Sequence, residues 1–128
     1  MRIALYQAQT GLDPETNGRD LVGAIAEAAK GGAAMLFTPE MSGLLDRDRE
    51  RAGPRLRNEA SDPVLAAVRA AAADHGIWIH LGSLALAQER DDERLVNRGF
   101  LIDDQGVIRA RYDKIHLFDV DLPTGESW

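Results

Sequence analysis

The sequence predicts an α/β fold whose elements follow one another in the order β-α-β-α-β-β-β. Three observations support this prediction. Short apolar runs are typical of buried strands, apolar residues recur at helical spacing in two stretches between those runs, and a turn-linked pair of strands follows the last of them. With 128 residues, the chain has the length of one domain at most.

The first β-α-β segment occupies the first third of the chain. Residues 2–9 are an apolar run with β-compatible side chains and are predicted to form a strand. Asn17 is a suitable N-cap for the helix that follows, with Asp20 near its first turn. Apolar residues then recur at helical spacing until the glycine pair at 31–32 ends the pattern, and residues 33–38 form the second predicted strand.

The remaining elements follow a long irregular stretch. Apolar residues show no sustained periodicity over residues 41–60, which are expected to form a long loop that allows for one helical turn. Asp62 and Pro63 predict the N-cap and first position of a second helix, which ends at His75 and Gly76. The rest of the prediction is a strand at 77–86, a charged turn at 88–94, a hairpin of residues 95–102 and 107–112 around the turn 103–106, and a loop at 113–128.

One face of the predicted sheet has no cover. Helical crossovers imply that the first three strands are parallel, and right-handed crossovers place both helices on the same face. Residues 33–37 and 77–81, however, are apolar at both alternating sets of positions, which is typical of strands buried on both faces. We therefore expect residues 1–128 to be an incomplete folding unit, covered by a missing C-terminal half or by another chain.

Composition excludes several classes of function. A formal net charge of −6 argues against binding of nucleic acid or of anionic membranes. The sequence contains no apolar run of transmembrane length and no signal peptide, which favours the cytoplasm. Three dispersed histidines and no cysteine give no metal site, and no glycine-rich phosphate loop follows the first strand, so no cofactor is expected.

Two charged residues stand out as candidates for chemistry. Glu40 closes the second predicted strand, and Lys114 follows the last one. The chain has only two lysines against thirteen arginines, so a lysine kept in an apolar setting indicates a need for a compact positive charge. We expect the two side chains to lie within a few ångströms of each other, in a cleft at the carboxyl ends of the strands. By position alone, Glu40 also fits an ordinary exposed carboxylate and Lys114 an ordinary surface lysine.

Five short segments carry a resemblance to a known family. They are residues 3–7, residues 37–41, the pair 82–83, the pair 97–98 and the run 111–119. In this order and separation they resemble the N-terminal half of nitrilase-superfamily carbon–nitrogen hydrolases, and the glutamate and the Lys-Ile-His-Leu-Phe-Asp run are the most specific parts. Residues 118–123 most resemble the amidase branch that repairs deaminated glutathione.

The resemblance implies an α-β-β-α sandwich in which residues 1–128 are the N-terminal part of a single domain whose C-terminal part is absent. It also implies homo-oligomers and hydrolysis of a small non-peptide amide through a Glu-Lys-Cys site. Glu40 matches the general base, with a pKa raised by an apolar surrounding, and Lys114 matches the group that holds the oxyanion. The nucleophilic cysteine is expected in a segment after Trp128.

Further site residues follow from the same resemblance. Glu126 is a candidate for the family's second glutamate, and a residue beyond Trp128 is the alternative. His116 and Asn97 are expected behind the site, His116 as a hydrogen-bonding or packing residue and Asn97 as a residue that fixes the backbone.

A second reading of the sequence stays open. The chain fits a non-catalytic α/β module that uses the same sheet surface for association. The reading frame past Trp128 discriminates between the two, because a cysteine at a strand end favours the enzyme, whereas a stop codon or a serine favours the association module.

Overall fold

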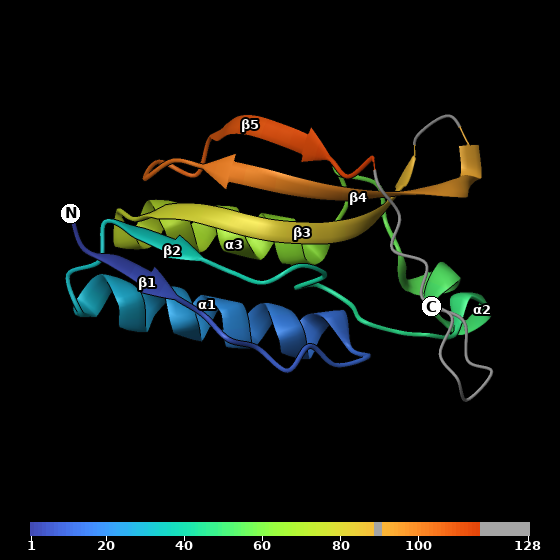
Figure 1. Cartoon of the computed structure of the whole chain (residues 1–128), viewed down its shortest axis with the longest axis horizontal. Helices are drawn as coiled ribbons and strands as arrows, with labels where there is room; N and C mark the ends of the chain where they lie inside the picture. The colour runs from blue at the N-terminus through green and yellow to red at the C-terminus, as the bar shows by residue number, and fades with distance from the viewer. Residues whose placement is uncertain (89–90, 116–128) are drawn as a thin grey trace.

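The structure, a computed structural model, describes residues 1–88 and 91–115. A five-stranded sheet has the strand order β1-β2-β3-β4-β5, which is also the order along the chain (Figure 1). Strands β1 (Ile3–Leu5), β2 (Met35–Phe37) and β3 (Trp78–Gln88) are parallel, as predicted. Strands β4 (Asp91–Ile102) and β5 (Ile108–Asp113) continue the sheet as an antiparallel meander, so β5 runs in the same direction as the first three strands.

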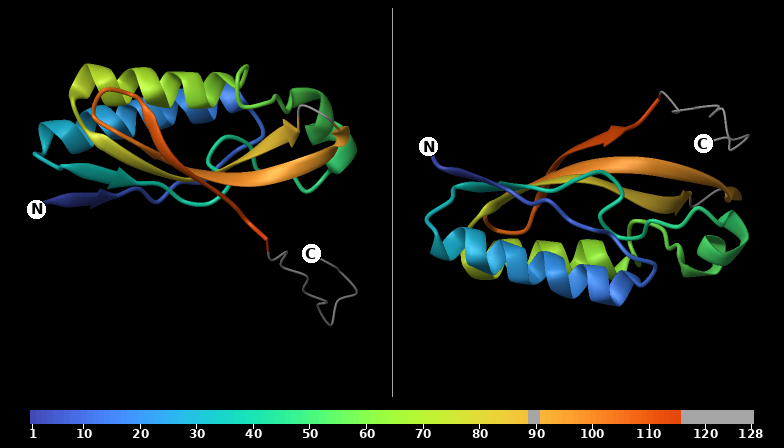
Figure 2. Two further views of the ribbon diagram at one scale, coloured as in Figure 1. Left: turned by 90° about the horizontal axis from the view of Figure 1, so that it is seen from above. Right: turned by 60° about the horizontal axis from the view of Figure 1, so that its bottom comes forward.

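Two long helices cover one face of this sheet. Helix α1 (Pro14–Lys30) and helix α3 (Pro63–His75) lie side by side on that face (Figure 2), which confirms the placement expected from right-handed crossovers. The apolar stripes of both helices and one side-chain set of the strands form the core. Its large buried side chains include Leu21, Ile25, Leu65, Leu36, Ile79, Leu81 and Phe100.

The opposite face carries no helix among the described residues (Figure 2). Alternation along the strands places apolar side chains there as well. Ala4 packs against the core, whereas its neighbours Ile3 and Leu5 are 47% and 74% exposed. The rings of Phe37 and His80 lie side by side on neighbouring strands, with centroids 5.3 Å apart. An apolar sheet surface is therefore open to solvent in this part of the chain.

Helix α1 begins earlier than the sequence analysis predicted. Asp13, not Asn17, is its N-cap, because the Asp13 carboxylate accepts a hydrogen bond from the Thr16 amide at 3.1 Å and Pro14 occupies the first turn. Asn17 is instead buried inside the helix. Its side-chain amide donates to the carbonyls of Gly11 and Gly43 at 2.9 and 3.0 Å, which ties two loops to α1.

Other boundaries also differ from the prediction. Strands β1 and β2 are shorter than expected, and β4 takes up part of the predicted charged turn by beginning at Asp91. The predicted loop contains a short helix α2 (Arg49–Ala52) and a 3₁₀ turn (Gly53–Arg55), in place of the one helical turn for which the sequence allowed. The ends of α3 are confirmed: the Asp62 carboxylate caps it at the Leu65 amide, and Gly76 ends it in the left-handed conformation. Within the described ranges, no helix has the length and apolarity needed to span a membrane.

Candidate active site

The loop after β2 is held in an unusual conformation. Met41, directly after Glu40, has a φ of +56°, a value that non-glycine residues seldom adopt and that clusters at functional sites. The Met41 amide donates to the Ser83 hydroxyl at 2.9 Å, and the Ser42 amide donates to the Ser83 carbonyl at 2.9 Å. Residue 83 of β3 therefore fixes the turn that carries Glu40.

Gly82 lets this loop approach the sheet closely. A Cβ atom at this position would lie 2.4 Å from the carbonyl oxygens of both Thr38 and Pro39, a distance at which something must shift. The Gly82 amide also donates to the Thr38 hydroxyl at 3.1 Å. The glycine is thus required by the backbone path that leads into Glu40.

Glu40 and Lys114 meet across the end of the sheet. Lys114 Nζ donates to Glu40 Oε1 at 2.6 Å although 74 positions separate the two residues, so the expected proximity is confirmed. Because β2 and β5 run in the same direction, the residues that follow them lie at the same edge of the sheet. The Lys114 amide donates to the Asn97 carbonyl at 2.9 Å, which fixes the backbone from which the lysine side chain extends.

Asn97 takes a more direct part than the sequence analysis gave it. Its backbone carbonyl fixes Lys114, as expected of a residue behind the site, but its side-chain amide also donates to Glu40 Oε1 at 2.7 Å. The Asn97 carbonyl oxygen Oδ1 is buried and finds no donor in the described part of the chain. Lys114 and Asn97 both occupy Oε1, and no described residue donates to Glu40 Oε2.

The expectation of a raised pKa for Glu40 is wrong for this arrangement. The hydrogen bond from the Lys114 ammonium, followed by that from Asn97, holds the pKa of Glu40 below its ordinary value despite partial desolvation. The Glu40 side chain is 52% exposed, so burial is too weak to offset the two donors. Glu40 is therefore an anion at neutral pH.

An open hollow of about 390 Å³ surrounds the pair, lined by Glu40, Gly82, Ser83, Asn97, Gly99, Tyr112 and Lys114. Two hollows of similar volume lie beside Glu59, so volume alone does not identify the candidate site. The carboxylate–ammonium pair distinguishes the hollow at Glu40 from the other two. Among the described residues, no group of three metal-ligating side chains gathers at the hollow or elsewhere. Glu126 and His116 lie outside the described residues.

Residues 2–127 match the family model of the carbon-nitrogen hydrolases. The chain is 32% identical over 123 residues to the deaminated glutathione amidase of Yersinia enterocolitica, covering 94% of this chain and 41% of that protein. It thus spans about two fifths of the length of that relative.

Two solved structures are similar as well. The NitFhit protein of C. elegans superposes with a TM-score of 0.83 at 27% identity, over 98% of this chain and 30% of that one. A glutamate-to-glutamine mutant of an amidase from Nesterenkonia sp. AN1, which carries acrylamide added at its active-site cysteine, superposes with a TM-score of 0.77 at 30% identity, over 92% of this chain and 45% of that one. Both superpositions cover more than nine tenths of this chain, in agreement with the mixed α/β arrangement described above. The chain belongs to the carbon-nitrogen hydrolase family.

Proposed function

We propose that these residues form part of an amidase-like carbon–nitrogen hydrolase that cleaves a small non-peptide amide, with Glu40 and Lys114 in its active site. The observation that carries the proposal is the 2.6 Å contact between Lys114 Nζ and Glu40 Oε1 at the carboxyl edge of the sheet. Family membership supports this reaction class, and the geometry supports a role for these two residues in it.

The third group of the proposed site is a cysteine thiol. Residues 1–128 contain no cysteine, so the thiol must come from outside them. The Nesterenkonia amidase has a cysteine in its active site, which supports a nucleophile of this kind. As in the sequence analysis, Glu126 remains the candidate for a second glutamate and His116 for a residue behind the site.

In the proposed reaction, Glu40 is the general base and then the general acid. Its Oε2 atom is available to take the thiol proton, because Lys114 and Asn97 occupy Oε1. The thiolate attacks the amide carbonyl carbon, the C–N bond breaks, and the proton on Glu40 passes to the departing amine or ammonia. Water then attacks the thioester carbonyl carbon while Glu40 takes a proton from it. The C–S bond breaks to release the carboxylic acid, and the proton on Glu40 returns to the thiolate.

Lys114 is proposed to stabilise the oxyanion. Its ammonium is already fixed beside Glu40, so little rearrangement is needed when negative charge develops on the carbonyl oxygen. The hollow around the pair is open and small, which fits a small amide substrate. The relatives named deaminated glutathione amidase make that compound the first substrate to test. We also propose that the protein forms homo-oligomers and is located in the cytoplasm.

The test uses the full-length protein encoded by the reading frame, with deaminated glutathione and simple primary amides as substrates. We expect Glu40→Gln and Lys114→Ala each to lower kcat by about 100-fold or more, the scale of removing a general base or an oxyanion donor. Lys30→Ala and Glu27→Gln on the exposed side of α1 are the matched controls and should leave kcat unchanged.

Circular dichroism should be the same for all four variants. If either site variant keeps near-wild-type kcat, its proposed role is refuted. A reading frame without a cysteine beyond residue 128, together with no turnover of any amide, would favour the non-catalytic association module instead.

A further inference from the structure

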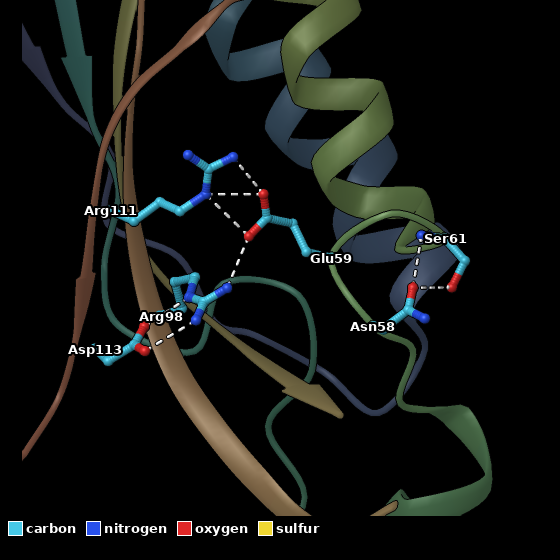
Figure 3. A network of polar contacts seen from close by, with 6 residues as sticks. All are labelled: Asn58, Glu59, Ser61, Arg98, Arg111 and Asp113. Atoms are coloured by element: carbon cyan, nitrogen blue, oxygen red, sulfur yellow. Dashed lines mark hydrogen bonds and ion pairs between the residues drawn. The ribbon is translucent and has the colours of Figure 1, made fainter. Parts of the chain in front are cut away.

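Four charged side chains form a cluster on the face of the sheet opposite to the Glu40–Lys114 pair. Glu59 comes from the loop before α3, Arg98 from β4, and Arg111 and Asp113 from β5 (Figure 3). The Arg98 guanidinium donates to both Asp113 oxygens, at 2.6 and 2.9 Å, and to Glu59 at 2.8 Å. Arg111 makes a second two-pronged contact with Glu59, at 2.6–3.0 Å.

The formal charges of the four side chains cancel within the cluster. Two guanidinium groups face two carboxylates, and the hydrogen bonds among them use both oxygens of each acid. Arg111, and after it Arg98, hold the pKa of Glu59 low, and Arg98 does the same for Asp113. Since no charge is left uncompensated within the cluster, these residues fit an internal clamp better than a site for a charged ligand.

The loop that carries Glu59 is itself fixed. Asn58 Oδ1 accepts hydrogen bonds from the Ser61 amide at 3.0 Å and from the Ser61 hydroxyl at 2.8 Å (Figure 3). The Arg57 carbonyl accepts from the Ala87 amide of β3 at 3.0 Å. The backbone around Glu59 is therefore held in place by hydrogen bonds, so that its carboxylate has a fixed position for binding the two arginines.

The position of the cluster in the strands connects it to the candidate site. Arg98 and Asp113 are direct partners in the β4–β5 register. Asn97 and Lys114 are their immediate neighbours in sequence, and successive residues of a strand point to opposite faces. The chain thus places the ion pair on the helix side and the two donors to Glu40 on the open side of the same strand pair.

We propose that the Glu59–Arg98–Arg111–Asp113 cluster is a positioning device that holds the backbone at Asp113, and so keeps Lys114 within reach of Glu40. The catalytic consequence rests on the proposed function; the positioning itself does not. Lys114 is the first residue after β5, and the hydrogen bond from its backbone amide to the Asn97 carbonyl is the last described contact of the strand pair. Without the two-pronged Arg98–Asp113 contact, that end of β5 can separate from β4.

The experiment compares variants of the full-length protein, three of them in both readouts and a fourth, Arg98→Lys, in the kinetics. Asp113→Asn removes the charge but keeps the shape of the side chain, and Glu59→Gln weakens the anchor while leaving the Arg98–Asp113 pair intact. Arg109→Gln is the matched control, because it breaks the Arg109–Asp103 ion pair at the other end of the same hairpin. Melting temperatures show whether the variants lose comparable stability.

The first readout is hydrogen exchange of the Lys114 amide, which does not depend on activity. We expect exchange to become several-fold faster in Asp113→Asn, less so in Glu59→Gln, and to be unchanged in Arg109→Gln. Unchanged exchange in both cluster variants overturns the proposal. If Asp113→Asn does not fold, Glu59→Gln alone decides the result.

The second readout is steady-state kinetics. We expect kcat to fall about 10- to 100-fold in Asp113→Asn with little change in KM, the scale of a small misplacement of a catalytic group. Arg98→Lys, which keeps the charge but loses the fork, should give an intermediate kcat. Faster exchange without a loss of kcat supports the positioning and contradicts the proposed role of Lys114 in the reaction.

Discussion

Glu40 is stabilised as a carboxylate by two donors that meet on one of its oxygens. Lys114 contributes an ammonium and Asn97 an amide, at 2.6 and 2.7 Å from Oε1. Both donors favour the ionised form, so they lower the pKa of Glu40 instead of raising it. A base that is already ionised at neutral pH needs no prior loss of a proton before it accepts one from a thiol.

We expect Lys114→Met to raise the pKa of Glu40, because the variant removes the largest stabilising contact of the carboxylate. The measurement is an NMR titration of the Glu40 carboxyl carbon, with Lys30→Met as the control that removes the other lysine of residues 1–128. Asn97→Leu should raise the pKa by a smaller amount. A Glu40 titration that does not change in Lys114→Met would contradict the contact.

The Lys114–Glu40 contact also determines the direction in which the stability of the fold changes with pH. A carboxylate whose folded-state pKa is lowered stabilises the fold at pH values above its ordinary pKa, and this contribution is lost as the pH falls through the folded-state value. The Glu40 side chain is half exposed, so solvent screening keeps the contribution to the free energy of unfolding small.

At the scale of elements, the loop from Thr38 to Ser42 depends on the glycine of β3. We expect Gly82→Ala to destabilise the fold by about 1–3 kcal/mol, as overpacking usually does, because its Cβ would lie 2.4 Å from two carbonyl oxygens. The displaced loop should also weaken the Glu40–Lys114 contact. Denaturant unfolding measures the first effect and the Glu40 titration the second.

Gly23→Ala in α1 is the matched control. A Cβ at Gly23 would meet nothing within 4 Å, and alanine is the better helix former by about 1 kcal/mol. The control should therefore stabilise the protein. A Gly82→Ala variant as stable as the wild type would show that the loop after β2 can move at no cost.

The element order and the parallel strands could be predicted from local patterns, whereas Glu40 and Lys114 were chosen as candidates through the family resemblance. Proline, glycine and apolar periodicity are local signals, and they located α3 closely. The start of α1 was missed because Asp13 and Asn17 are both good N-caps, and the competing role of Asn17 as a bridge between Gly11 and Gly43 depends on tertiary structure.

The ion-pair cluster was also beyond the sequence analysis. Opposite charges at Arg98 and Asp113 hint at a cross-strand pair once the register of the hairpin is known. Nothing local places Glu59, in an irregular loop, beside them. The hydrogen bond from the Asn97 side chain to Glu40 was missed for the same reason, since it joins residues 57 positions apart.

At the scale of the whole molecule, the open sheet face is the feature with the largest energetic consequence. Ile3, Leu5 and Tyr112 are 47%, 74% and 64% exposed, and both long helices lie on the other face. A contiguous apolar surface of several hundred Å² is worth several kcal/mol when hidden, at about 25 cal/mol per Å². We therefore expect this face to pack against a second sheet.

We expect residues 1–128 expressed alone to self-associate and to bind a hydrophobic dye. Without a cysteine they should also have no amidase activity. Leu5→Lys, on the edge strand β1, should reduce association and dye binding without unfolding the chain, because the side chain is largely exposed. Sedimentation showing a compact monomer at micromolar concentration, with no dye bound, would refute the two-sheet arrangement.

The identity of strand order and chain order gives the molecule a natural point of division. A cut in the exposed 3₁₀ turn between Gly53 and Pro54 would leave β1 and β2 with α1 on one fragment, and β3, β4 and β5 with α3 on the other. Each fragment would keep an uninterrupted block of the sheet. Glu40 would belong to the first and Lys114 to the second, so their contact would form only when the two pieces recombine. The candidate site is thus itself a reporter of fragment complementation.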